Sequence, residues 1–235
     1  MKTGIGRLFG TERGRSNGEH WLTISDLMAG LMMVFLFISV ALMRSAFIDR
    51  DRIREVAVAY REGQVAIDQA LRSEFENDLE KWDAAIDSEN LIFEFRSPEV
   101  LFESGSAILR PQFITILDDF FPRYLRVLRE FETAIDEVRI EGHTSSDWIS
   151  ASADEAYFKN MQLSQGRTRS VLEYVYKLPT GFGDRSWVRR RIAAVGLSSS
   201  RLVMNNGKED PEASRRVLFR VVTNAETQIR KILEY

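Results

Sequence analysis

Apolar positions fall into three patterns along the chain, and the first is an unbroken run near the amino end. Residues 27–43 read LMAGLMMVFLFISVALM and contain no charged side chain. The apolar stretch extends back to Trp21, with Asp26 as its single charged residue. A helix of this length rises about 34 Å at ~1.5 Å per residue, enough to cross a hydrocarbon core of about 30 Å. We therefore predict a transmembrane helix over residues 21–46, preceded by a tail of residues 1–20.

A cleaved signal peptide and a buried core helix are the alternatives for this run. The apolar core of a signal peptide is about 7–15 residues long and precedes a small-residue cleavage site, and the sequence has neither feature here. The core helix of a soluble protein normally has a polar face, and residues 27–43 have none. Both comparisons favour the membrane-spanning helix.

The second pattern is a charged segment with a helical apolar stripe, over residues 47–90. Apolar residues recur there in steps of three and four, which places them on one face of a long helix. The stripe comprises Val56, Tyr60, Ile67, Leu71, Phe75, Leu79, Trp82 and Ile86. We predict a helical stalk that pairs with a second copy of the chain to form a homodimer. A helix that folds back onto its own carboxy-terminal domain is the alternative.

The third pattern alternates between strand and helix. The stretches with strand patterning are residues 91–95, 137–143, 191–196 and 216–222. Helices are predicted from Pro111 onward, with a kink or break at Pro122, and over residues 163–176. Two polar stretches, residues 147–158 and 207–214, are predicted to be loops. The order β-α-β-α-β-β predicts an α+β sandwich over residues 91–223, followed by a short helix over residues 224–235.

Composition excludes several kinds of chemistry. The 235 residues include no cysteine, so disulfides, thiol catalysis and cysteine-ligated metals are excluded. The two histidines, His20 and His143, are too few for a multi-histidine metal centre. The net charge of −3 provides no overall attraction to nucleic acid, and none is expected to bind directly. With no nucleophile–base pair, phosphate-binding loop or metal cluster in the sequence, we predict a protein that is not an enzyme and holds no cofactor.

Asp26 is the residue of the apolar run with the clearest chemical potential. An ionised carboxylate at the centre of a membrane helix costs roughly 2.5–3.5 kcal/mol, so such residues usually face a protein interior or an ion path. In one interpretation Asp26 lies at the interface and caps the helix start. In the other it is an ion-translocating residue that takes up and releases H⁺, or binds Na⁺.

Four ordered motifs in the carboxy-terminal part resemble the OmpA-like peptidoglycan-binding family. They are LFESGSAILRPQF, VRIEGHTSS, NMQLSQGRT and SRRVLFRV, and the resemblance covers residues 91–223. It implies a pocket for the diaminopimelate carboxylate and amine of the peptidoglycan stem peptide. In that pocket Arg167 would grip the carboxylate, Asn160 and Leu163 would shape the walls, and Thr144 would line it. A guanidinium suits this role because it binds a carboxylate through two parallel hydrogen bonds.

The sequence departs from the OmpA-like pattern at one pocket position. Ser145 stands where the family usually has Asp, and the loop that follows is longer than usual. The partner of the ligand ammonium is therefore missing, or is supplied by Asp147 or Asp154. For Arg167 the structural alternative is a surface helix charge. For the pair Arg215 and Arg216 in the last motif (residues 214–221), structural ion pairing is expected rather than ligand contact.

The amino-terminal part resembles the MotB-like stator subunits of ion-driven motors. These proteins have a short cytoplasmic tail, one membrane helix with an Asp near its start, a linker and an OmpA-like domain. The membrane-segment sequence ISDLMAGLMMVFLFI is most similar to the ZorB family, the MotB-like subunits of Zorya anti-phage defence systems. The resemblance implies that Asp26 translocates ions in an inner-membrane motor, and that two copies of the chain lie inside a five-membered ring of a multi-span MotA-like (ZorA-like) subunit.

The orientation in the membrane follows from this resemblance, because positive charges on the two sides of the helix tie in number. A peptidoglycan anchor must be periplasmic, which places the amino end in the cytoplasm. A flagellar-type MotB stator subunit and a passive tether between membrane and cell wall are the alternative functions.

Overall fold

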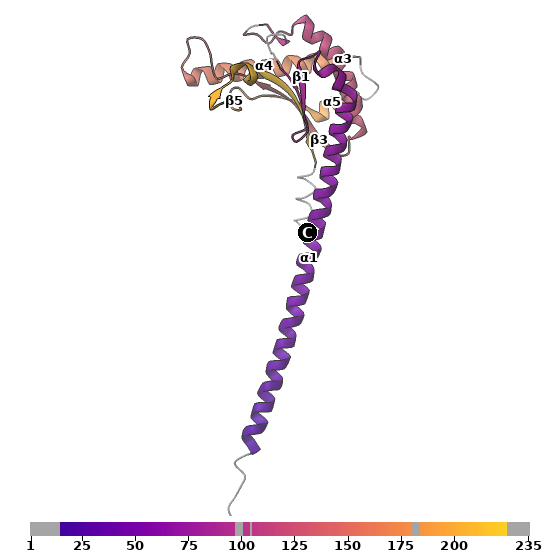
Figure 1. The fold of residues 1–235 in the computed structure, drawn as a ribbon, viewed down its shortest axis with the longest axis vertical. Coiled ribbons are helices and arrows are strands. Elements are labelled where there is room, and N and C mark those ends of the chain that lie inside the picture. The colour runs from indigo at the N-terminus through magenta and orange to yellow at the C-terminus, as the bar shows by residue number, and fades with distance from the viewer. Residues whose placement is uncertain (1–14, 97–100, 104, 180–183, 225–235) are drawn as a thin grey trace, which may run out of the picture. The chain divides into compact units, whose positions relative to one another are not determined.

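The computed structural model describes residues 15–96, 101–103, 105–179 and 184–224 (Figure 1). The chain divides into two compact units, residues 1–55 and residues 56–235, which are described separately below. Most of the predicted amino-terminal tail, and nearly all of the helix predicted for residues 224–235, lie outside the described residues.

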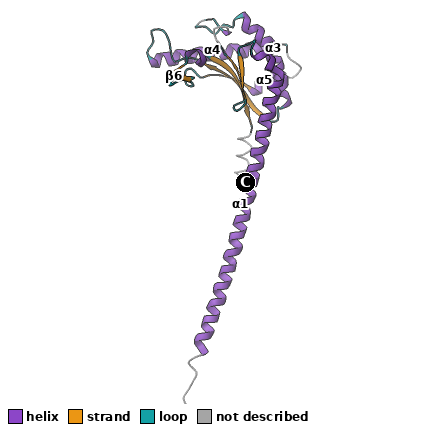
Figure 2. Ribbon diagram, in the orientation of Figure 1, coloured by secondary structure: helices purple, strands orange, loops and turns teal. Residues whose placement is uncertain are grey.

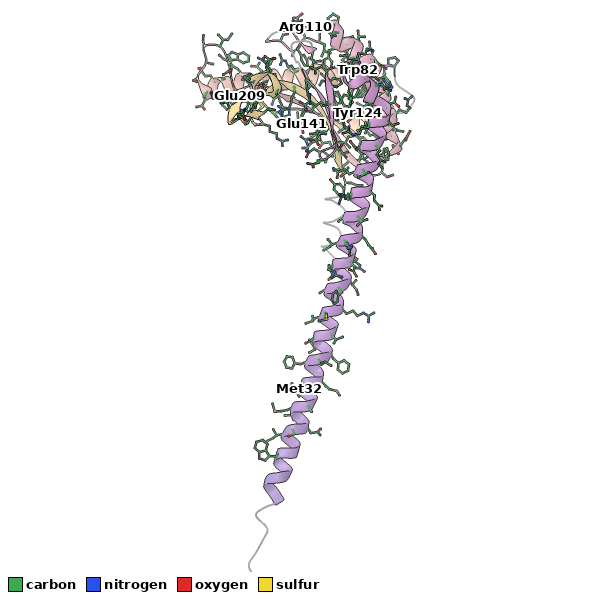
Figure 3. The ribbon with its side chains drawn as sticks, viewed as in Figure 1. Met32, Trp82, Arg110, Tyr124, Glu141 and Glu209 are labelled. Carbon is green, nitrogen blue, oxygen red and sulfur yellow. The ribbon has the colours of Figure 1, made fainter. Side chains whose placement is uncertain are left out.

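In the first unit the apolar run lies within helix α1, Arg15–Leu79. The helix begins six residues before Trp21, where the membrane-spanning segment was predicted to start. It is long and apolar enough to cross a membrane, and its most apolar window has a mean hydropathy of 2.2 with none of it buried. Large side chains such as Met32, 69% exposed, project from the helix (Figure 3). This uncovered apolar surface fits a lipid or partner-helix environment.

In the second unit the last turns of α1 belong to the core of the domain. Ile67, Leu71 and Phe75, all members of the predicted stripe, are fully buried. Arg123 of α3 (Pro111–Glu130) pairs with Glu74 at 2.7 Å and with Asp78 at 2.9 Å, and it lies over the Phe75 ring. This part of the stripe therefore packs within its own chain, which was the alternative to pairing with a second copy.

The predicted stalk helix ends before residue 90. Helix α1 stops at Leu79, and Ala84–Asp87 form strand β1, so the prediction of helix through Ile86 is wrong. Trp82 is buried in the core, and Asp83 takes a left-handed backbone conformation with φ of 47° that reverses the chain. The four-residue spacing of Trp82 and Ile86 had indicated a continued helix. These two residues instead pack on the same core from a turn and from strand β1.

One five-stranded sheet organises the domain, in the order β1-β2-β7-β3-β4 (Figure 2). The remaining strands are β2 (Ile92–Phe95), β3 (Ile135–His143), β4 (Ile192–Gly196) and β7 (Arg216–Thr223). Strands β3 and β4 are parallel, and the other neighbours are antiparallel. The core-facing strand residues pack with buried side chains of α1, α3 and α4 (Ala153–Lys177), which line one face of the sheet. The predicted α+β fold is confirmed.

Several element boundaries differ from the predictions. Helix α4 begins at Ala153 rather than at residue 163, because Ser152 and Glu155 form a capping box that starts the helix inside the predicted loop. Helix α3 continues through Pro122 instead of breaking there. Four short elements were not predicted: α5 (Asp184–Arg191), β5 (Met204–Asn205), β6 (Lys208–Glu209) and α6 (Pro211–Ser214).

Two glycines let α4 approach the ends of the parallel strands. Gly142 of β3 and Gly196 of β4 are partners in register. A Cβ at Gly142 would lie 2.8 Å from Thr168 Cγ2, and one at Gly196 would lie 2.4 Å from the backbone nitrogen of Gln165. Only glycine permits this contact, which places the middle of α4 beside the loop that leaves β3.

Candidate functional site

A pocket of about 610 Å³ lies where the loop after β3 meets α4. Its other walls come from the segment before α3 and from Arg215, which directly precedes β7. The five side chains predicted to bind the stem peptide all line it, and they are Thr144, Ser145, Asn160, Leu163 and Arg167. The fold therefore brings together two motifs, on a strand end and on a helix, that are separated in the sequence.

Arg167 is a buried cation in this pocket, with 8% of its surface exposed. Its Nε donates to the carbonyl oxygen of Ser106 at 3.0 Å, and its guanidinium lies 4.9 Å from the centre of the Phe102 ring. Within the described ranges it forms no ion pair with a carboxylate. Burial, with a smaller effect of nearby Arg215, lowers the pKa of Arg167 to about 10, so it stays charged at neutral pH. A buried charge without a counter-charge is costly, and a ligand carboxylate offsets that cost.

Two more arginines make the pocket electropositive. Arg110 lines it and donates from Nε to the carbonyl oxygen of Phe102 at 3.0 Å. Arg215 lines it as well, while forming the predicted structural ion pair with Glu212. Asp147 is the acidic residue among the lining side chains. Three guanidiniums and one carboxylate suit a ligand that carries more carboxylates than amines.

Thr144 and Asn160 are buried polar residues of the pocket lining. The Thr144 side chain is 3% exposed, and its Oγ1 has no hydrogen-bond partner among the described residues. The side-chain nitrogen of Asn160 donates to the carbonyl oxygens of Ser145, at 3.1 Å, and Asp147, at 3.2 Å. Asn160 thus holds the loop after β3 in place, and Thr144 offers a buried hydroxyl to a ligand.

The two candidate partners for a ligand ammonium are placed differently. Asp147 lines the pocket, whereas Asp154 lies exposed in the first turn of α4 and is absent from the lining. Ser145, which replaces the usual Asp, is 6% exposed and also lines the pocket. Within the described ranges no group of three or more His, Asp or Glu side chains is placed to hold a metal ion.

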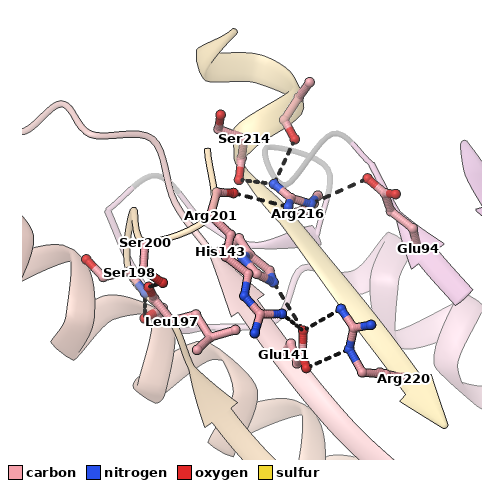
Figure 4. Close-up of polar contacts among 12 residues, drawn as sticks. Glu94, Glu141, His143, Leu197, Ser198, Ser200, Arg201, Ser214, Arg216 and Arg220 are labelled. Atoms are coloured by element: carbon pink, nitrogen blue, oxygen red, sulfur yellow. Dashed lines mark hydrogen bonds and ion pairs between the residues drawn. The ribbon is translucent and has the colours of Figure 1, made fainter. Parts of the chain in front are cut away.

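A second polar cluster lies on the other face of the sheet and was not predicted from the sequence (Figure 4). Glu141, 2% exposed, accepts two hydrogen bonds from Arg220, at 2.9 and 3.3 Å. His143 Nε2 and Arg201 Nη1 lie 3.5 and 3.8 Å from its Oε2. The carboxylate is therefore compensated inside the protein, and this cluster is structural.

The pKa directions in the cluster follow from these contacts. Burial alone raises the pKa of Glu141, but its contacts with His143 and Arg220 outweigh burial and lower that pKa to about 2. Burial lowers the pKa of His143, and nearby Arg216 adds to the decrease against the opposing effect of Glu141. His143 is the last residue of strand β3. It is 2% exposed, and its ring nitrogens form no hydrogen bonds within the described ranges.

Replacing Glu141 with Gln is expected to lower the unfolding midpoint of the full chain in detergent at pH 7. A folded-state pKa of about 2, against an ordinary value of 4.5, corresponds to up to about 3 kcal/mol of stability, or about 6–12 °C. This stability is fully present above pH 4.5 and is lost as the pH falls toward 2. The difference between Glu141→Gln and wild type therefore shrinks between pH 5 and pH 3, as measured by tryptophan fluorescence.

Glu137 provides the matched control for this measurement, because it pairs with Arg139 at 2.7 Å on a more exposed part of the same strand. Glu137→Gln is expected to change the midpoint by no more than about 2 °C. An equal loss for Glu141→Gln at every pH would contradict the electrostatic explanation, because it would show that packing alone accounts for the effect.

Asp26 lies in the first unit, on α1, with its side chain exposed in the single chain. Ala29 and Gly30, three and four positions later, share its helix face. Helix side chains lean toward the amino end, so large residues at these two positions would cover the carboxylate. A Cβ at Gly30 would meet nothing within 4 Å. The Asp26 carboxylate is therefore open to a neighbouring helix.

Comparison with known proteins identifies the family. No protein-family model matches the chain. Zorya protein ZorB from Escherichia coli strain Crooks is 56% identical over 220 residues, a match that covers 93% of this chain and 94% of that protein. The chain belongs to the ZorB family. The resemblance of its membrane segment to ZorB proteins is thus confirmed along nearly the whole sequence.

Two solved structures are similar to this ZorB-family chain. The cell wall anchor of the T6SS from Pseudomonas aeruginosa is 25% identical with a TM-score of 0.46, over 65% of this chain and 96% of that one. A MotB-like protein from Desulfovibrio vulgaris is 23% identical with a TM-score of 0.47, over 72% of this chain and 94% of that one.

Proposed function

We propose that this chain is the peptidoglycan-anchored, stator-type subunit of a proton-driven inner-membrane motor complex in anti-phage defence. The observation that carries the proposal is the buried Arg167 guanidinium, which lines the pocket and forms no ion pair with a carboxylate among the described residues. The defence role rests on the similarity to Zorya protein ZorB.

The pocket chemistry supports a diaminopimelate stem peptide as the ligand. Arg167 takes the free carboxylate through paired hydrogen bonds, and the unpartnered Thr144 hydroxyl lies in the same lining. Asp147 takes the ammonium in place of the Asp that Ser145 replaces. The surplus of guanidiniums over carboxylates suits the stem peptide, whose acidic groups outnumber its amines.

The membrane part of the proposal concerns Asp26. A single helix cannot enclose an ion path, so Asp26 requires a multi-span MotA-like subunit around it, arranged as a five-membered ring with two copies of this chain inside. The amino end lies in the cytoplasm and the sheet domain in the periplasm. Protons are the expected ions, and Na⁺ is the alternative. One charge crossing ~100 mV releases roughly 2.3 kcal/mol, which can drive movement of the partner ring.

Binding to purified cell-wall sacculi tests the anchor. The full chain in detergent is expected to co-sediment with sacculi of the diaminopimelate type and to be released by a soluble diaminopimelate stem tetrapeptide. A tetrapeptide with lysine in place of diaminopimelate lacks the free carboxylate and is the matched competitor that should not release it. Failure to sediment, or equal release by both peptides, would contradict the proposed function.

A further inference from the structure

The loop that follows the pocket strand carries two large apolar side chains at the pocket. Trp148 and Ile149 both belong to the lining, and Ile149 is 92% exposed. The Trp148 ring has Lys159 Nζ 6.0 Å from its centre. Neither residue packs into the hydrophobic core. Ile149 is exposed and Trp148 is half-buried, so core packing does not explain either side chain. An apolar surface left uncovered beside a binding pocket usually contacts a ligand.

The loop is held in place in spite of this exposure. Asn160 binds the carbonyl oxygen of Asp147, directly before Trp148. Ser146 donates from its backbone nitrogen to Glu209 of β6 at 2.9 Å, and its hydroxyl bonds the same carboxylate. Ser150 takes a left-handed conformation with φ of 59°, after which Ser152 caps α4. A loop fixed at both ends presents its apolar side chains with little ordering cost on binding.

The pocket lining combines two kinds of chemistry. The Arg167 guanidinium and the Thr144 hydroxyl suit a carboxylate. Trp148 and Ile149 add apolar side chains, with Lys159 as a polar neighbour of the indole ring. The side chains of a stem peptide are small or charged, and none covers an indole ring. A sugar ring does, because one face of a pyranose carries C–H groups and its rim carries hydroxyls.

We infer that Trp148 and Ile149 form a carbohydrate subsite that holds a sugar of the peptidoglycan glycan strand, next to the stem-peptide site. This inference rests on the proposed function, because the sugar reaches the loop as part of the same ligand. The apolar sugar face stacks on the indole, and the Lys159 ammonium donates to the hydroxyls at the rim. The longer loop of this chain thus adds contacts to the glycan beside those to the peptide.

Two soluble ligands that differ only in their sugars test the subsite. The full chain in detergent is titrated with a disaccharide-tetrapeptide and with the same tetrapeptide freed of its sugars. Wild type is expected to bind the disaccharide-tetrapeptide about fivefold more tightly, the size of one aromatic stacking contact. Trp148→Ala should remove this difference and leave the affinity for the free peptide within twofold. Trp148→Phe, which keeps an aromatic ring, should restore most of the preference.

Phe158 provides the matched control, since it is 70% exposed on α4 and does not line the pocket. Phe158→Ala should leave both affinities unchanged. Equal wild-type affinities for the two ligands, or an equal loss on both with Trp148→Ala, would overturn the subsite while leaving the stem-peptide site intact. Absence of binding to either ligand would overturn the proposed function and the subsite together.

Discussion

Replacing Asp26 with Asn is expected to abolish phage protection while leaving the amount of membrane-inserted protein unchanged. Asn has nearly the same shape as Asp but cannot take up and release a proton, so each ion transfer fails. Replacing a charged residue with a neutral one also eases insertion of the helix into lipid. The measurement compares phage plating on cells that carry the complete defence system, with protein levels in membranes measured by immunoblot.

Asp49 supplies the matched control on the same helix. It is an exposed carboxylate that lies after the apolar run of α1. Asp49→Asn removes one negative charge, as Asp26→Asn does, and is expected to retain protection. Retained protection in Asp26→Asn at normal protein levels would contradict ion coupling and support a passive tether between membrane and cell wall.

Arg167→Ala is expected to weaken binding of the diaminopimelate stem peptide by about 30- to 150-fold. This range corresponds to about 2–3 kcal/mol for charge-assisted hydrogen bonds to one carboxylate. The same change should leave the unfolding midpoint equal or higher, because it removes a buried charge without an ion-pair partner among the described residues. Weaker binding without loss of stability separates a ligand-binding role from a structural one. Titration of the full chain in detergent provides the affinity.

Arg169 is the matched control for this substitution. It lies two residues further along α4, on the surface, where it pairs with Glu173 at 2.7 Å. Arg169→Ala should leave the affinity for the stem peptide within twofold. Arg167→Lys keeps the charge but loses the paired hydrogen bonds, so its affinity should fall between those of wild type and Arg167→Ala. An unchanged affinity in Arg167→Ala would place the ligand elsewhere.

The parts of the fold that depend on local sequence could be predicted. The apolar run around Leu27–Met43 and the strands near the OmpA-like motifs have local patterns, and their predicted positions agree with the structure to within a few residues. The pocket residues Thr144 and Arg167 came from motifs in the sequence. The start of α4 could also have been predicted from the sequence, because Ser152 and Glu155 have the spacing of a capping box.

Other features depend on contacts between distant segments. The stripe with Ile67 and Phe75 indicates a buried helix face, but nothing local says whether its partner is a second copy or the domain that follows. The Glu141 cluster requires the register of β3 with β7, which brings Arg220 from 79 positions away. For Arg215 the sequence predicted structural ion pairing, and its position in the pocket lining follows from the packing of β7 beside β3.

The central role given to Arg167, recognition of a stem-peptide carboxylate, is tested most directly by changing that carboxylate. The full chain is titrated with the diaminopimelate tetrapeptide and with the same peptide after amidation of its free diaminopimelate carboxylate. Wild type should bind the amidated peptide about 30- to 150-fold more weakly, and Arg167→Ala should bind both peptides equally weakly. Equal wild-type affinity for the two peptides would contradict carboxylate recognition by this pocket.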